Sequence, residues 1–408
     1  MNETFFRLWQ SSSVVLLKRA VLRIIHLSRL LRFFVLDALV GFQPLLRTHR
    51  SLLVVRLEGI GDYILFRNFL KTLKLQSRFS QHTITLCGNE SIRDFALSFD
   101  KEVVDDFIWI RPKTFVSSAV YRFGMLQSIR KRGFEVILSP THSRDTLLGD
   151  SIVRCCGAEE TIGCYGDDVH ARNWERRLFN RWYTTLITTR QSTTFEFLRN
   201  KEFFEQLLGI HVSIKKPSLR LESQDPKSGS YVVLCPDALH PKKRWRIEHF
   251  LEICDYLFSR HKLTSVLVGG MTIRSSRIQA MIEGRSHVVN HLGKTTLTET
   301  TSLVQQSVFV VSNDTGVSHI GVALDKLVIV LSNGEHYGRF TYPLDVYRSI
   351  HYAFPPEIAH SVESYDNLVQ RYKYGSSLNI NSITSSAVIE LVDQVLLSVE
   401  QKRSASRP

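Results

Sequence analysis

The stretch Val310-Val311-Ser312-Asn313-Asp314-Thr315-Gly316-Val317-Ser318-His319 decides how the rest of the chain is interpreted. Apolar residues 308–311 predict a buried strand, and apolar residues return at helical spacing after the turn, so the stretch predicts strand, turn and helix. Asn313, Asp314 or Thr315 can cap that helix, and Gly316 lets a ligand approach the backbone. Because helix N-termini attract anions, the turn suits a phosphate; the alternative is a capped helix without a ligand.

Two further stretches have a similar character. Apolar residues 52–57 predict another strand, which Glu58-Gly59-Ile60-Gly61-Asp62 follows before a helix begins near Tyr63. The glycines of this turn are too few for a dinucleotide fingerprint. The third stretch is Lys242-Lys243-Arg244-Trp245, after the first strand of a second strand–helix array.

Gly61-Asp62, Lys243-x-Trp245 and Asp314-Thr315-Gly316-x-x-His319 together make the chain resemble glycosyltransferase family 9, the lipopolysaccharide heptosyltransferases. The last motif is the most specific. The resemblance covers roughly residues 50 to 400 and not the first 46. It implies a GT-B fold, in which two doubly wound Rossmann-like domains face a cleft.

The bulk properties narrow the class of protein. The chain has 408 residues, enough for two domains with substantial cores. Hydrophobic residues make up 43% and the mean hydropathy is −0.06, as expected of a globular protein. Six scattered cysteines form no C-x-x-C pair, so we expect neither a zinc site nor a disulfide framework, and a reducing cytoplasm fits.

Positive charge is concentrated at the start of the chain. The net charge is +13, and residues 1–50 hold eight basic residues against two acidic ones. We therefore expect an anionic partner, either lipid head groups or an acidic glycolipid; no nucleic-acid motif is present, so nucleic acid is not expected.

Residues 13–42 predict an amphipathic helix with a basic face. That face holds His26 together with Lys18, Arg19, Arg23, Arg29 and Arg32. Such a helix can lie in a membrane interface, but its clean apolar run is too short to span a bilayer. The alternative is a helix that packs on the protein itself or on a second subunit.

Strand and helix patterns alternate from Ser51 onward. Strands are predicted at 52–57, 82–87, 103–110 and 134–139, and then at 231–235, 263–268, 286–290, 308–312 and 327–331. This alternation predicts an α/β fold with doubly wound parallel sheets. The predicted domains are a helical extension (1–46), an acceptor-side domain (47–212) and a nucleotide-sugar domain (213–380). Residues 381–408 are predicted to form a C-terminal helix, which crosses back to the first domain and ends in a polar tail.

Glycosyl transfer needs a base for the acceptor hydroxyl and positive charge for the leaving diphosphate. Asp62, just past a strand end, is the candidate base; the resemblance supports this role, and a helix cap is the alternative. Lys243 is the candidate cation, with a solvated basic run as the alternative. The resemblance implies no metal or other cofactor. No Asp-x-Asp sequence is present to hold a divalent ion, and His287 and His291 flank a strand rather than share a helix face.

The remaining candidate residues bind the two substrates. Asp314, Thr315 and Gly316 are expected to hold the donor, while His319 either orients it or is structural. The other candidate donor residues, at loops that follow strands, are Gly269, Gly270 and Arg339. The candidate acceptor residues are Gly61, Arg172 and Arg176, although the arginines also fit a solvated amphipathic helix. The first motif departs from the family at Asn68, where a proline is usual, which affects the helix geometry.

The sequence thus predicts an inverting, metal-independent transferase that moves a heptose-like sugar, with ADP-heptose as the donor that the resemblance implies, onto a glycolipid or oligosaccharide. It would act at the inner face of the cytoplasmic membrane. The alternatives are a catalytically silent sugar-nucleotide or glycolipid binding protein and another GT-B enzyme such as a nucleotide-sugar epimerase.

Overall fold

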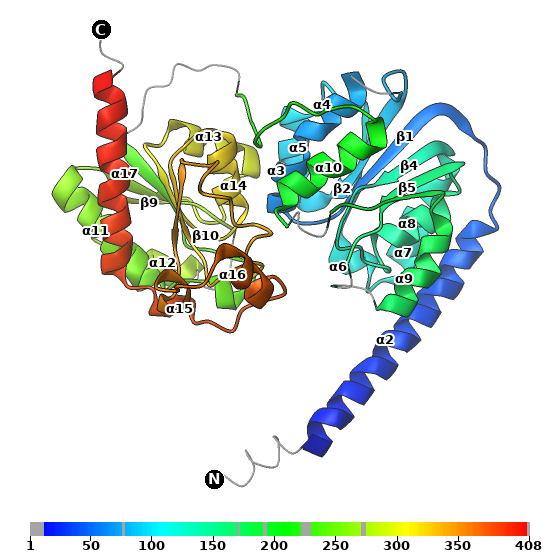
Figure 1. The fold of residues 1–408 in the computed structure, drawn as a ribbon, viewed down its shortest axis with the longest axis horizontal. Helices are drawn as coiled ribbons and strands as arrows, with labels where there is room; N and C mark the ends of the chain where they lie inside the picture. Colours follow the sequence, from blue (N-terminus) through cyan, green and yellow to red (C-terminus); the bar gives the residue numbers. More distant parts are fainter. Residues whose placement is uncertain are drawn as a thin grey trace. The chain divides into compact units, whose positions relative to one another are not determined.

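The computed structural model describes residues 12–405, apart from residues 76–77, 168, 170–171, 191–193, 222–229 and 271–274. Two six-stranded sheets carry helices on their faces (Figure 1). By their contacts, residues up to Leu57 group with His82–Gly88 and Phe107–Ile187 as a first unit. Glu58–Gln81 and Asn89–Asp106 group with the residues from Thr188 onward as a second unit.

The sheet of the first unit has the order β3-β2-β1-β4-β5-β6. Its strands are β1 (Thr48–Arg56), β2 (Thr83–Asn89), β3 (Asp106–Ile110), β4 (Phe134–Ser139), β5 (Glu160–Cys164) and β6 (Thr185–Ile187). β1 pairs in parallel with both β2 and β4. Its last six residues are all buried, as expected of a central strand covered on both faces.

Helices of the first unit include a long N-terminal one. They are α2 (Ser12–Gly41), α6 (Pro112–Phe115), α7 (Ala119–Lys131), α8 (Gly149–Cys156) and α9 (Asn173–Phe179). The predicted N-terminal helix is confirmed. Its C-terminal half packs against α7 and α8, where Phe33, Asp37 and Val40 are buried. Among the described residues, no helix is both long enough and apolar enough to cross a bilayer.

The sheet of the second unit has the order β12-β11-β10-β7-β8-β9, with every neighbouring pair parallel. Its strands are β7 (Tyr231–Cys235), β8 (Thr264–Leu267), β9 (Val288–Asn290), β10 (Val310–Asn313), β11 (Val328–Leu331) and β12 (Ile350–Ala353). Strand order reverses between β7 and β10. In open parallel sheets, ligands bind beyond the carboxyl ends of the strands at such a switch point.

The second unit holds the helices around this sheet and also the helices that follow β1 and β2 in the chain. They are α3 (Ile60–Phe66), α4 (Asn68–Leu75), α5 (Arg93–Phe99), α10 (Glu196–Leu208), α11 (Ile247–His261), α12 (Ser275–Met281), α13 (Leu297–Gln306), α14 (Gly316–Ala323), α15 (Pro356–Ala359), α16 (Tyr365–Tyr372) and α17 (Ser385–Ala405). Short 3-10 turns lie at Glu90–Ile92, Asn180–Trp182, Pro241–Lys243 and Ile380–Ser382.

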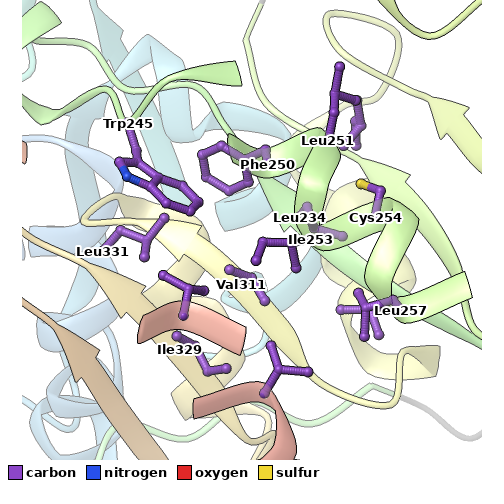
Figure 2. Close-up of a cluster of buried hydrophobic side chains, with 14 of the residues drawn as sticks. Leu234, Trp245, Phe250, Leu251, Ile253, Cys254, Leu257, Val311, Ile329 and Leu331 are labelled. Atoms are coloured by element: carbon purple, nitrogen blue, oxygen red, sulfur yellow. The ribbon is translucent and has the colours of Figure 1, made fainter. Parts of the chain in front are cut away.

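The core of the second unit forms where α11 packs on the sheet. Figure 2 shows Trp245 and Phe250 beside aliphatic side chains of β7, β10 and β11. The buried side chains of helix α17, Val388, Val392 and Val395 among them, belong to this core.

One predicted helix is divided in two. The sequence predicted a single helix that begins near Tyr63, but the structure has α3 and α4 with a break at Arg67. Asn68 stands at the start of α4, and its side-chain amide donates to Ser218 O (2.9 Å) while its oxygen accepts from Ser218 N (2.9 Å). The residue that replaces the usual proline therefore anchors the segment that precedes the second sheet.

Three strands were not predicted. β5, β6 and β12 have only five, three and four residues, and β6 and β12 lie at sheet edges. The sequences of β6 and β12, such as Ile350-His-Tyr-Ala353, lack a long apolar run, because an edge strand need not be apolar on both faces.

Candidate active site

The turn after β10 is tied to the loop after β7 through a buried amide. Asn313, fully buried, donates to Pro236 O (2.8 Å) and accepts from Trp245 N (3.3 Å). Trp245 is itself buried, and its indole donates to Ile383 O (2.9 Å). The Lys-x-Trp and Asp-Thr-Gly motifs are therefore held side by side at the switch point of the second sheet.

Lys243 and Asp314 form a largely buried ion pair in this place. Lys243 Nζ lies 2.8 Å from Asp314 Oδ2. Burial alone would lower the pKa of Lys243, but the carboxylates of Asp314, Glu335 and Asp62 outweigh it and hold that pKa above its ordinary value. The lysine therefore remains charged over the whole neutral range.

Asp62 lies in the first turn of α3, which begins after Gly59. Its Oδ1 is 3.6 Å from Nη2 of Arg339, and both side chains are largely buried. Arg339 also donates through Nε to Glu196 Oε2 (3.1 Å). Since the Glu196 N–H donates to Arg339 O (2.9 Å), the arginine is held at both its backbone and its side chain.

Close packing joins the Gly-Asp turn to the Asp-Thr-Gly turn. A Cβ on Gly61 would lie 2.7 Å from His319 Cδ2, and a Cβ on Gly316 would lie 2.5 Å from Ile60 Cγ2. Both positions need glycine because the starts of α3 and α14 touch there. Thr315 is the N-cap of α14 but makes no side-chain capping bond.

His319 is a buried, neutral residue. Burial lowers its pKa to about 4, and Nδ1 is hydrogen-bonded with the hydroxyl of Tyr342 (2.8 Å). Its other ring edge packs on Gly61. The ring of His319 therefore links the two turns.

Gly269 and Gly270 follow β8 and lie against Asp237, which follows β7. Gly269 has φ +144°, and a Cβ there would lie 2.9 Å from Asp237 Cβ. Burial raises the pKa of Asp237, although Arg244, 3.6 Å away, opposes the shift. The two glycines thus border the same sheet edge as Lys243, one strand further along.

Arg172 and Arg176 belong to the first unit, on α9. Arg172 is exposed and N-caps the helix, and its backbone N–H donates to Glu175 Oε2 (3.0 Å). Arg176 donates to Gly166 O (3.4 Å) and lies 4.8 Å over the ring of Tyr165. Arg176 is therefore engaged by neighbouring groups of the first unit, whereas the Arg172 side chain is exposed.

The sequence did not single out Glu196. It is 1% exposed and stands on the buried side of α10 with Phe197, Asn200 and Phe204. A carboxylate at helical spacing with apolar residues is the signal that could have found it, because buried carboxylates need a cationic partner. Its partner, Arg339, is remote in sequence, so the pair itself could not be read from spacing.

The described part of the chain contains no group of three or more His, Cys, Asp or Glu side chains that could hold a metal ion. The six cysteines are all buried and free.

The fold is that of the GT-B heptosyltransferases. A family 9 glycosyltransferase from Veillonella parvula superposes with a TM-score of 0.63 at 16% identity, over 86% of this chain and 98% of that one. The heptosyltransferase WaaC of E. coli, solved with ADP, gives 0.61 at 15% identity, over 85% and 99%. ADP-heptose LPS heptosyltransferase II of E. coli gives 0.60 at 16%, over 86% and 99%.

The family model for glycosyltransferase family 9 (heptosyltransferase) matches residues 122–352, more than half of the chain. The chain therefore belongs to glycosyltransferase family 9. A comparison with curated proteins found no match.

Proposed function

We propose that this chain is an inverting, metal-independent glycosyltransferase that moves a heptose-like sugar from ADP onto a lipopolysaccharide or related glycolipid acceptor. One observation carries the proposal. Asp62, Lys243, Asp314 and Arg339, which come from four separate stretches, form a single cluster of largely buried charges at the starts of α3 and α14. The donor is proposed from the relatives, since WaaC was solved with ADP and with a fluorinated ADP-heptose.

Each side chain would have one task in the reaction. The Asp62 carboxylate takes the proton of the acceptor hydroxyl, whose oxygen attacks the anomeric carbon on the face opposite the diphosphate. The bond from that carbon to the diphosphate oxygen breaks, and ADP leaves with the electron pair. Lys243 and Arg339 offset the developing negative charge, so side-chain cations supply what a metal ion supplies elsewhere.

Lys243 is paired with Asp314, so a donor that binds to Lys243 would rearrange the pair. A diphosphate that binds at the start of α14 would take over Lys243, because a dianion offers it more charge than one carboxylate does. Asp314 would then turn to the sugar hydroxyls. Gly269 and Gly270 would border the nucleotide, and Arg172 would contact the acceptor.

A glycolipid acceptor would bring the enzyme to a membrane. We propose that it works at the inner face of the cytoplasmic membrane, with the basic segment 13–42 on the anionic lipid surface and no nucleic-acid partner. The net charge of +13 supports this part of the proposal.

The test compares two charge-removing variants with matched controls. ADP at 100 times its Kd should stabilise the wild type by about 2.7 kcal/mol. Lys243→Ala should weaken ADP binding about tenfold or more, while Lys242→Ala, at the exposed neighbouring lysine, should not. Equal losses in the two lysine variants would remove Lys243 from the donor site.

Asp62→Asn should keep the ADP-induced stabilisation and lose transfer by about 10²–10⁴-fold, measured as ADP released from ADP-heptose with heptose-free lipopolysaccharide. Asp366→Asn, at an exposed carboxylate in α16, is the control for charge. Full transfer by Asp62→Asn would refute the base, and absence of stabilisation by any nucleotide would refute the donor.

A further inference from the structure

Helix α2 has one face fixed to the first unit. Asp37 accepts two hydrogen bonds from Arg122, from Nε and Nη2, each 2.7 Å long, and both side chains are buried. Arg154 donates to Phe34 O (3.2 Å) and lies over the Phe34 ring. Because these contacts hold the helix by this side, no other partner can use it.

The opposite face carries a row of exposed apolar side chains. Leu27, Leu31, Val35 and Leu39 are four residues apart, so they line up along the helix, and they are between 45% and 66% exposed. We call these four residues the apolar ridge. Phe42 and Leu46, just beyond the helix, are more than 80% exposed. Single exposed leucines are common, but a contiguous row marks an interaction surface.

We propose that the apolar ridge inserts into the surface of an anionic lipid bilayer, with α2 parallel to the membrane. This inference rests on the proposed membrane site of action and adds which face of α2 meets the lipid. From Leu27 to Leu39 the ridge is about 18 Å long, at 1.5 Å per residue. Interfacial helices of this kind bury one apolar face at the boundary of head groups and acyl chains.

The position of Asp37 is consistent with this orientation. In the sequence, the charge of Asp37 interrupts the apolar residues of α2, and such an interruption argues against a segment that faces lipid. In the structure Asp37 lies on the docked side, bound to Arg122, and not among the ridge residues. The only acidic residue of α2 is therefore kept away from the lipid.

The positive charge of the N-terminal segment favours a bilayer over a second copy of the chain as the partner of the apolar ridge. Residues 1–50 hold eight basic and two acidic residues, and Arg32 is exposed beside the ridge. Two copies paired through their ridges would bring two strongly basic segments together. An anionic membrane would instead attract the segment, and the apolar contact would add to that attraction.

The first experiment is flotation of the full chain with vesicles of phosphatidylglycerol and phosphatidylethanolamine, and with vesicles of phosphatidylcholine alone. The wild type should float with the anionic vesicles. The variant L31E/V35E should lose this binding at least about tenfold. The control V346E/V362E changes the net charge equally at exposed valines of the second unit and should keep nearly all of it.

Equal losses in both variants would overturn the ridge, since net charge alone would then explain binding. The proposal also fails if the wild type floats with neither vesicle, or if only its oligomeric state changes in L31E/V35E. Stabilisation by ADP, measured on the same proteins, reports the donor site separately and should be the same in all three. Loss of that stabilisation in every protein would count against the proposed function and not against the ridge.

A labelling experiment keeps the proposal testable if L31E/V35E misfolds. All six native cysteines are buried, so a cysteine introduced by Leu31→Cys can be labelled selectively with a polarity-sensitive dye. Anionic vesicles should shift its emission to the blue, whereas the dye at Val362→Cys should not respond. The same emission from both positions would overturn insertion.

Discussion

Gly61 shows at the scale of one residue how the two turns of the candidate site depend on each other. Gly61→Ala places a methyl group 2.7 Å from His319 Cδ2, so the histidine or the turn must move. We expect a loss of about 1–3 kcal/mol in the free energy of unfolding, the usual cost of overpacking, measured by urea denaturation. Gly124→Ala in α7 has no atom within 4 Å of the new Cβ and should be neutral or slightly stabilising.

The double variant G61A/H319A identifies the cause of the loss. If the ring of His319 is what the methyl group meets, the two substitutions together should cost less than the sum of their separate effects. Additive costs would mean that Gly61 is needed for another reason.

His319 also predicts a dependence on pH. Its pKa is about 4 in the folded chain and about 6.5 when unfolded, so between these values the unfolded chain binds the proton and the folded chain does not. Stability should fall as the pH falls from about 6.5 to 4, by up to about 3 kcal/mol from this residue. Parallel stability curves for wild type and His319→Gln over this range would contradict the prediction.

Residues at the ends of predicted strands were the most predictable part of the candidate site. Asp62 and Asp314 each follow a buried apolar run, and parallel strands gather such positions at one sheet edge. Glu196 could have been found only from its helical spacing with apolar residues, because its burial and its pairing with Arg339 arise from tertiary packing. The ion pair between Lys243 and Asp314 likewise could not be predicted from the spacing of residues in the sequence, although both residues were candidates for the site.

At the scale of elements, α2 depends on the buried Asp37–Arg122 pair. Asp37→Asn removes one charge of the pair and leaves Arg122 uncompensated, which should cost about 3 kcal/mol and expose α2 to limited proteolysis. Asp105→Asn breaks the more exposed pair with Lys74 and should cost about 0–1 kcal/mol.

Replacing both partners distinguishes a requirement for charge from one for packing. D37N/R122M should recover part of the stability lost in Asp37→Asn, because no buried charge is then left without its partner. A double variant less stable than Asp37→Asn alone would show that the Arg122 side chain is needed for packing, as its stacking on Phe33 and Phe115 also allows.

A helix or strand could be predicted where its local sequence pattern matches its burial in the structure. Central strands such as β1 and β11 carry apolar residues on both faces, so their runs stand out, whereas β6 and β12 are short edge strands with mixed sequences. The break between α3 and α4 depends on the contact of Asn68 with Ser218, 150 residues away, which no local pattern contains. The hydrophobic face of α17 could be predicted from the sequence, but the core into which this face packs could not.

At the scale of the whole molecule, elements that follow one another in the sequence do not always belong to the same structural unit. Helix α3 follows β1 in the sequence, yet it groups by contact with the unit that holds α14. Because Gly61 packs on His319 and Gly316 on Ile60, local opening of either turn should disturb the other. A ligand bound at the start of α14 should therefore stabilise α3 as well.

Hydrogen exchange with and without ADP tests this coupling. At 100 times its Kd, ADP should slow exchange up to about 100-fold for amides that open only when ADP dissociates, and we expect this in both Gly316–Ala323 and Ile60–Phe66. In Gly61→Ala the protection of α3 should shrink relative to that of α14, since the contact between the turns is strained. If ADP protects α14 alone in the wild type, the two turns do not open together, and the packing of Gly61 on His319 matters for stability but not for how α3 responds to the donor.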